Sequence, residues 1–269
     1  MEYKIIKFVA QSVVKLKKYP IRITHFVLFL TFAGIASCGP QQTVSTINGK
    51  ELRITDASGE NAKIAKFIAP YREHINKELN TVLAYAPQTL DKSGQWQSAM
   101  GNLFSDAVIK KADPVFLARE NKHIDICMLN HGGIRAVIPQ GNITKKTAFE
   151  IMPFENTAVV VELKGAQILE LAEYIIAEKK PHPLSGLTFL IDKNNKPVKL
   201  MVQGKSLDVN KTYNVVTNDY LYNGGDNMVF FKKGIQVYDL DYKLRNILID
   251  YFIDVDTVPL IADKRIITE

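Results

Sequence analysis

The feature that most constrains the fold is a buried strand that stops at a glycine loop. The run Ile124-Asp125-Ile126-Cys127-Met128-Leu129 is short and largely apolar. Such a run, bounded by turn residues, is typical of a strand inside a core. It ends at Asn130-His131-Gly132-Gly133, where the glycines permit backbone conformations that other residues avoid. The sequence therefore predicts a sheet with a polar loop at the end of one central strand.

Further strands and helices interleave along the chain of 269 residues. Apolar patterns predict strands over 158–163, 187–191, 198–202 and 213–217, and helices over 100–111, 166–180 and 240–253. An earlier helix is predicted from six apolar residues spaced by three or four, and Pro70 should kink it. These six residues are Ile64, Ile68, Tyr71, Ile75, Leu79 and Val82. Because the order follows no strict βαβ alternation, we expect an α/β domain with a mixed sheet.

The first 37 residues have the order of an export signal. They contain six Lys and Arg residues and one Glu, so they contribute +5 of the net charge of +6. The apolar run over 26–35 is shorter than the roughly 20 residues that a membrane-crossing helix needs. The rest of the chain carries only +1, so we expect no nucleic-acid-binding face, which would need clustered Lys and Arg.

The leader ends in Ile35-Ala36-Ser37-Cys38, which resembles the lipobox of bacterial lipoproteins. The resemblance implies cleavage before Cys38 and lipidation of its thiol. The protein would then be an exported lipoprotein, anchored in a membrane on the periplasmic side or at the cell surface. The alternative is a soluble secreted protein with an incidental cysteine. The other cysteine, Cys127, lies in the apolar strand and is expected to be a core residue.

Four segments in a fixed order resemble one family. They are Gly101-Asn102-Leu103-Phe104-Ser105-Asp106-Ala107, Asn130-His131-Gly132-Gly133-Ile134-Arg135, Met152-Pro153-Phe154-Glu155-Asn156-Thr157 and Thr217-Asn218-Asp219-Tyr220-Leu221-Tyr222-Asn223-Gly224-Gly225-Asp226. Together they are similar to the C-terminal domain of 5'-nucleotidases and related nucleotide and UDP-sugar hydrolases. The resemblance spans about residues 62–252. It implies a layered mixed-sheet domain of that type, preceded by a helical linker.

The segments supply residues suited to a nucleotide pocket. Gly132 and Gly133 let the backbone approach a ligand, the Asn130 amide can read a base edge, and the Arg135 guanidinium can hold an anion in a fork. The resemblance further implies three roles: Phe154 and Tyr220 would sandwich the base, and Asp226 would bind the ribose hydroxyls. Alternatively, the same residues could have no role in ligand binding: the glycines would form a plain turn, Arg135 would be a surface residue, Phe154 and Tyr220 would be core residues, and Asp226 would belong to a turn.

Two departures from the family pattern bear on this site. His131 stands where the family has the first glycine of a triplet, so its side chain could narrow the pocket, shift the loop or contact phosphate. The family also often carries arginines before its first segment, whereas Gln95-Trp96-Gln97-Ser98-Ala99-Met100 has none. One phosphate-binding cation is therefore expected to be missing.

The family hydrolyses its substrates with two metal ions held by an N-terminal domain. That domain needs D-x-H, G-N-H-[DE] and G-H-x-H motifs, and none of the five histidines here forms one. We therefore expect no catalytic residue, no metal site and no cofactor in this chain, and divalent metals only in a partner. Because hydrolysis by this chain alone is not expected, whether it acts in an enzyme at all stays open.

The sequence is compatible with two functions. The chain could be the substrate-binding half of a nucleotide-degrading phosphohydrolase whose metallophosphatase is a separate protein. It could instead be a lipid-anchored protein without catalysis, which binds nucleosides or nucleotides or serves as an envelope scaffold. The expected organisation is a signal peptide over 1–37, a flexible tether over 38–60, a linker helix over 61–90, the folded domain over 91–256 and a C-terminal tail over 257–269.

Overall fold

The computed structural model describes residues 20–35, 44–55, 59–259, 261 and 263–269. The chain divides into two units, residues 1–60 and 61–269. In the first unit, helix α2 spans Pro20–Ile35. No helix within the described ranges has both the length and the apolar character needed to span a bilayer. Cys38, the predicted lipidation site, lies outside the described residues.

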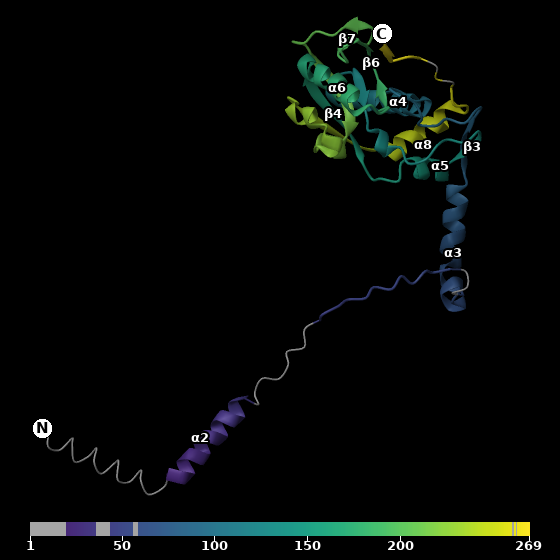
Figure 1. The fold of residues 1–269 in the computed structure, drawn as a ribbon. Coiled ribbons are helices and arrows are strands. Elements are labelled where there is room, and N and C mark those ends of the chain that lie inside the picture. The colour runs from purple at the N-terminus through teal and green to yellow at the C-terminus, as the bar shows by residue number, and fades with distance from the viewer. Residues whose placement is uncertain (1–19, 36–43, 56–58, 260, 262) are drawn as a thin grey trace, which may run out of the picture. The chain divides into compact units, whose positions relative to one another are not determined.

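The second unit is a mixed α/β domain (Figure 1). Its helices are α3 (Ala62–Leu79), α4 (Ala99–Glu120), α5 (Lys145–Ile151), α6 (Gly165–Glu178), α7 (Asp219–Tyr222) and α8 (Leu244–Val255), with short 3₁₀ turns at His131–Gly133, Gly225–Asn227 and Val229–Lys233. Its strands are β1 (Val82–Ala86), β2 (Ile126–Met128), β3 (Gly141–Thr144), β4 (Thr157–Lys164), β5 (Leu184–Ser185), β6 (Leu187–Ile191), β7 (Pro197–Val202), β8 (Lys205–Ser206), β9 (Thr212–Asn218), β10 (Val237–Lys243) and β11 (Ile266–Thr268).

The central sheet has five strands in the order β10-β4-β9-β2-β5. β2 pairs with β9 in parallel, whereas β4 runs antiparallel to both β9 and β10. This mixture of directions confirms the predicted mixed sheet. A second sheet has the order β11-β6-β7-β8, and β1 pairs with β3.

The central sheet is buried on both faces. Neighbouring residues of β4 alternate, so that Val160 joins a core cluster with α4 and α8 while Val161 joins one with α6. The same alternation places Val216 and Val215 of β9 in different clusters. Side chains on a strand point alternately to the two faces, so both clusters pack on the same sheet. The domain therefore has helix, sheet and helix layers.

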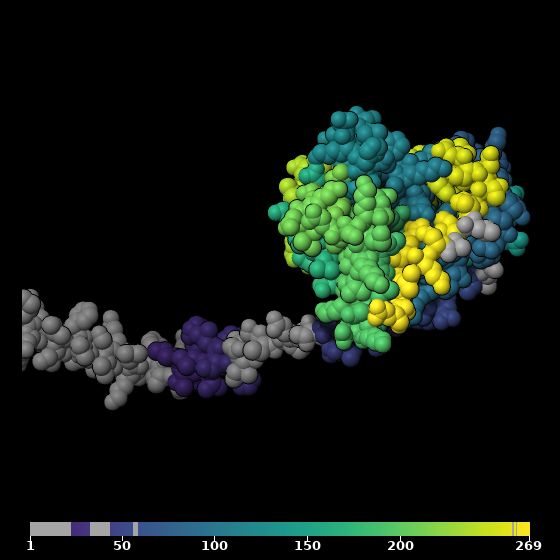
Figure 2. All heavy atoms as spheres, turned by 90° about the horizontal axis from the view of Figure 1, so that it is seen from above, coloured from purple at the N-terminus to yellow at the C-terminus, as the bar shows by residue number. Residues whose placement is uncertain are grey.

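The predicted elements differ from the structure at several places, and the helix predicted over 100–111 continues to Glu120 as α4. Helix α3 ends at Leu79, so Val82, assigned to the helix by its spacing, begins β1 instead. The helix predicted over 240–253 is replaced by β10 and then α8, because residues 237–243 alternate and pair with β4. The segment assigned to a tail over 257–269 contains β11, which pairs in parallel with β6. Figure 2 shows this yellow end of the chain against the green strands.

Helix α3 projects from the body of the second unit (Figure 1). Asn61 caps its first turn, accepting hydrogen bonds from the amides of Lys63 and Ile64. Pro70 lies inside the helix, and none of the helix residues is buried. Its apolar side chains are therefore half-buried or exposed, with Phe67 at 70% and Tyr71 at 62% of full exposure.

Candidate functional site

One edge of the central sheet carries a cavity of about 430 Å³. Three loops meet there because of the strand directions: parallel strands β2 and β9 both end at this edge, and antiparallel β4 begins at it. All seven residues predicted to bind substrate line this cavity, together with Met152, Asn156 and Asn218. The seven are Asn130, Gly132, Gly133, Arg135, Phe154, Tyr220 and Asp226. Their positions are thus established, while their binding role stays a prediction.

A hydrogen-bonded network joins the two sides of the cavity. The Asn130 amide donates from Nδ2 to Oδ2 of Asp226 at 2.8 Å, and the Tyr220 hydroxyl donates to Oδ1 at 2.9 Å. The bond to Asp226 raises the pKa of the Tyr220 phenol above its ordinary value. Asp226 has a left-handed backbone, with φ of 49°. This network fixes the carboxylate between the amide and the phenol.

The loop of residues 130–133, here called the asparagine loop, needs its second glycine for packing. A Cβ on Gly133 would lie 2.8 Å from Oδ1 of Asn130, which is closer than real contacts allow. A Cβ on Gly132 would meet its nearest atom at 3.5 Å, an ordinary contact. Gly133 therefore lets Asn130 turn toward Asp226.

Two aromatic side chains line the cavity without being buried. Phe154 is 42% and Tyr220 is 47% exposed. The Arg135 guanidinium lies 6.0 Å from the centre of the Phe154 ring, and its Nη1 donates to the Gly132 carbonyl at 3.4 Å. The Tyr220 ring packs directly on Gly225, where a Cβ would come within 2.4 Å of a ring carbon. The cavity thus offers partly exposed ring surfaces beside a cation.

The Phe154 loop is held by a residue far away in the sequence. Arg245, on α8, is buried and donates from Nη1 to the carbonyls of Met152 and Phe154, both at 3.4 Å. Its Nη2 also pairs with Glu155. The Arg245 bond, followed by the bond from Lys243, lowers the pKa of Glu155 to about 2. These contacts fix the backbone on both sides of the aromatic side chain.

His131 does not line the cavity. Its backbone amide donates to Nδ1 of His182 at 3.2 Å. Burial is the main cause that lowers the pKa of its imidazole, and the nearby charge of Lys92 contributes. The histidine therefore does not narrow the pocket, contrary to one of the expectations from the sequence.

Sequence reasoning missed several residues around the site. Asn218 is buried, and its side chain caps α7 by accepting from the amide of Leu221 at 2.8 Å. Lys92 donates from Nζ to the Ile134 carbonyl at 2.9 Å, between the asparagine loop and Arg135. Asn218 itself belongs to the last of the four segments, which could have indicated it. Nothing local in the sequence indicates that Lys92 or Arg245 would reach these loops.

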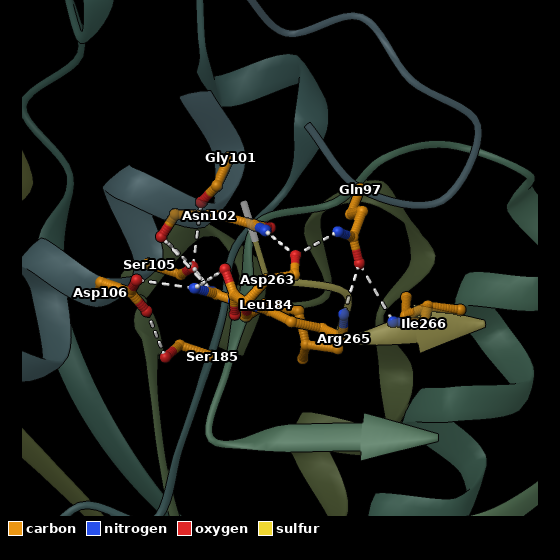
Figure 3. Close-up of polar contacts among 10 residues, drawn as sticks. All are labelled: Gln97, Gly101, Asn102, Ser105, Asp106, Leu184, Ser185, Asp263, Arg265 and Ile266. Carbon is orange, nitrogen blue, oxygen red and sulfur yellow. Dashed lines mark hydrogen bonds and ion pairs between the residues drawn. The ribbon is translucent and has the colours of Figure 1, made fainter. Parts of the chain in front are cut away.

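The first of the four segments contributes no residue to the cavity wall. Figure 3 shows its polar contacts. Asp106 accepts hydrogen bonds from Arg265 and from Ser185, both at 2.6 Å. Gln97 accepts from the backbone amides of Arg265 and Ile266, at 2.6 and 3.1 Å. The first segment therefore has a structural role. Asp106 on α4 and Gln97 just before α4 bind the residues at the start of strand β11.

The residues within the described ranges form no group of three or more His, Cys, Asp or Glu side chains that could hold a metal ion. Cys127 is buried in the core, and burial raises the pKa of its thiol.

Comparison with known proteins gives consistent matches. The family described as "5'-nucleotidase, C-terminal domain" matches residues 78–233. The trifunctional nucleotide phosphoesterase protein YfkN of Bacillus subtilis is 26% identical over 231 residues, covering 79% of this chain and 15% of that protein. The 5'-nucleotidase of Rattus norvegicus is 26% identical over 224 residues, covering 73% of this chain and 38% of the relative.

A solved structure supports the same assignment. The 5'-nucleotidase precursor from Thermus thermophilus superimposes with a TM-score of 0.64 at 27% identity. The match covers 81% of this chain and 45% of that chain. The chain thus spans less than half the length of each of these relatives.

Proposed function

Because this chain belongs to the 5'-nucleotidase C-terminal domain family, we propose that it binds a nucleotide or nucleoside in the cavity at the sheet edge. The observation that carries the proposal is the pairing of half-exposed Phe154 and Tyr220 with a fixed Asn130–Asp226 pair around one cavity. Exposed rings stack on any base, and each stacked base contributes about 1–3 kcal/mol.

Each of the seven residues predicted to bind substrate has a chemical role in this proposal. Phe154 and Tyr220 stack on the base, and the Asn130 amide reads its edge. The Asp226 carboxylate accepts hydrogen bonds from the ribose hydroxyls. Arg135, whose guanidinium stands beside Phe154, holds an anionic group such as phosphate. Gly132 and Gly133 let the ligand approach the backbone.

Calorimetric titration with AMP, adenosine and UDP-glucose tests the proposal. We expect at least one to bind, and the double variant Phe154→Ala with Tyr220→Ala to lose that binding while keeping its melting temperature. Phe67→Ala on α3 is the matched control, since this ring is exposed and does not line this cavity. Absence of heat with all three ligands, or full binding by the double variant, would contradict the proposal.

We further propose that hydrolysis requires a metallophosphatase supplied by a separate polypeptide. The sequence contains none of the three histidine motifs, and two-metal hydrolysis needs shared carboxylate and imidazole ligands. In this arrangement the chain presents the nucleotide, and the partner supplies the divalent metals and the attacking water.

Mixing this chain with a purified metallophosphatase domain from the same organism tests the split arrangement. Phosphate release from AMP should rise on mixing, and the rise should disappear when Phe154→Ala with Tyr220→Ala replaces the wild type. If the partner alone has the full rate, hydrolysis does not depend on this chain. If the chain still binds a ligand in that case, the alternative function applies, which is binding or scaffolding without catalysis.

Export as a membrane-anchored lipoprotein is a third part of the proposal, and it rests on the leader and on Cys38. Metabolic labelling with a radioactive fatty acid should label the wild type and leave Cys38→Ala unlabelled. Cys127→Ala, which removes a buried thiol, is the matched control and should remain labelled. Labelling of Cys38→Ala would exclude this residue as the anchor.

A further inference from the structure

His182 lies behind the cavity and is almost fully buried, with 3% of its surface exposed. Its Nδ1 accepts the backbone N–H of His131 at 3.2 Å, inside the asparagine loop. Acceptance at Nδ1 requires that this nitrogen carry no proton, so the ring is the neutral tautomer with its proton on Nε2. Nε2 is buried and has no hydrogen-bond partner among the described residues.

Tyr174 connects the same histidine to the opposite side of the cavity. Its ring centre lies 5.6 Å from that of His182. Its hydroxyl donates to the backbone carbonyl of Asp226 at 2.7 Å. The Asp226 carboxylate in turn holds Asn130, so the chain of contacts returns to the asparagine loop. His182 and Tyr174 therefore support both halves of the site without lining it.

We propose that neutral His182 is a positioning residue, which holds the asparagine loop in its binding geometry through the amide of His131. The inference rests on the proposed function, because it concerns ligand binding in the same cavity. Protonation would place a hydrogen on Nδ1, facing the His131 amide hydrogen. The acceptor would be lost, and the loop that orients Asn130 would have to move.

The surroundings of His182 keep it neutral under ordinary conditions. Burial, and then the nearby His131, lower its pKa to about 4. Lys180 acts in the same direction, whereas the carboxylates of Glu178 and Asp226 oppose it. A lowered pKa means that the supporting form is fully populated near neutral pH and is lost as the pH falls through about 4. Ligand affinity should fall over the same range.

Two variants of this residue test the role. In His182→Asn, the side-chain oxygen stands near the position of Nδ1, so the acceptor is kept but does not titrate. In His182→Leu, the acceptor is absent. We expect His182→Leu to bind AMP at least about 10-fold more weakly at pH 7, because leaving the partly buried amide of His131 without an acceptor is costly. His182→Asn should bind close to wild type at pH 7 and lose less affinity between pH 7 and pH 4.

Hydrogen exchange of the amides of residues 130–133 gives a readout that needs no ligand. Exchange should be faster in His182→Leu than in wild type and restored in His182→Asn. Tyr174→Phe keeps the ring and removes the bond to Asp226, and should weaken binding even if His182→Leu fails to fold. Wild-type affinity and exchange in His182→Leu, or the wild-type pH profile in His182→Asn, would overturn the inference. Failure of the wild type to bind any nucleotide would refute the proposed function, while exchange would still decide the positioning role.

Discussion

Gly225 supports the ring that we propose stacks on the base. A Cβ there would lie 2.4 Å from a carbon of the Tyr220 ring, so Gly225→Ala must displace the ring. We predict that calorimetry will show weaker nucleotide binding, by about 5- to 150-fold, which corresponds to the loss of one stacked face. The melting temperature should change little, since Tyr220 is 47% exposed and can swing outward.

A double-mutant cycle separates this effect from general damage. Once Tyr220→Ala has removed the ring, Gly225→Ala should cost no further affinity. Tyr220→Phe, which keeps the ring and loses the bond to Asp226, serves as the control and should still bind. Additive losses from Gly225→Ala and Tyr220→Ala would show that Gly225 acts by another route.

Glu155 gives the domain a predictable response to acid. Its pKa is lowered to about 2 from an ordinary value of 4.5, first by the bond from Arg245 and then by that from Lys243. The carboxylate therefore stabilises the fold above about pH 4.5, and this contribution is lost as the pH falls toward 2. We predict that Glu155→Gln lowers the melting temperature at pH 7, and that the difference between wild type and variant shrinks as the pH falls from 4.5 to 2 and vanishes below 2. Glu150→Gln, at an exposed carboxylate on α5, is the control; a constant difference across the range would contradict the prediction.

At the scale of residues, the sequence predicted the residues that line the cavity better than the residues that hold them in place. Asn130 and Asp226 belong to segments that carry the family resemblance, and both line the cavity. Arg245 and His182 lie outside those segments, and neither has a local pattern that ties it to the site. They were missed because a contact between distant positions depends on the packing of α8 and of the loop before β5.

Besides its pairing with β6 and the contacts of Gln97, strand β11 is held by the buried arginine that directly precedes it. Arg265 donates to Asp106 at 2.6 Å and to Asp263 at 2.7 Å, and also to Ser105 and the Leu184 carbonyl (Figure 3). We predict that Arg265→Met lowers the free energy of unfolding by about 3–5 kcal/mol, because Asp106 and the carbonyl lose their buried partner. Urea denaturation measures this change. Lys264→Met, at the exposed neighbour, should stay within about 0.5 kcal/mol of wild type, and equal losses in both variants would exclude the specific role of Arg265.

Helices and strands were predicted well where one apolar periodicity continues over the whole element. They were predicted poorly where the periodicity of a strand changes directly into that of a helix. The strand over 158–163 and the helix over 166–180 correspond to β4 and α6 within a few residues. Around 237–255 an alternating segment runs directly into a helical one, and only the pairing of β10 with β4 decides where the change occurs. Strand β11 is short, so its pairing with β6 could not be inferred from its own sequence.

For the molecule as a whole, the sequence predicted the fold class, and the structure confirms it. Interleaved apolar segments are enough to indicate a mixed sheet between helices. The order of strands is not encoded locally, because it depends on which strands pair across long separations. The same limit applies to the cavity, whose three loops meet only through the directions of β2, β4 and β9.

The distribution of charge gives a prediction for the whole chain. Residues 1–37 contribute +5 of the net +6, so the remainder is close to neutral. A chain without this leader should pass through a heparin column at low salt, because it lacks the clustered cations that bind a polyanion. The full chain, kept soluble in detergent, is the control and should be retained. Retention of the shortened chain at low salt would reveal a basic face that the net charge conceals.

The network that ties Asn130 and Tyr220 to Asp226 also bears on the kinetics of binding. A cavity whose polar walls are already fixed does not have to rearrange before a ligand enters. Binding should therefore need no slow conformational step after the ligand reaches the cavity. Ligands of similar size and charge would then associate at similar rates. Differences in affinity among bases and sugars would then lie mainly in the dissociation rates. The residence time would distinguish a substrate from a ligand that binds weakly.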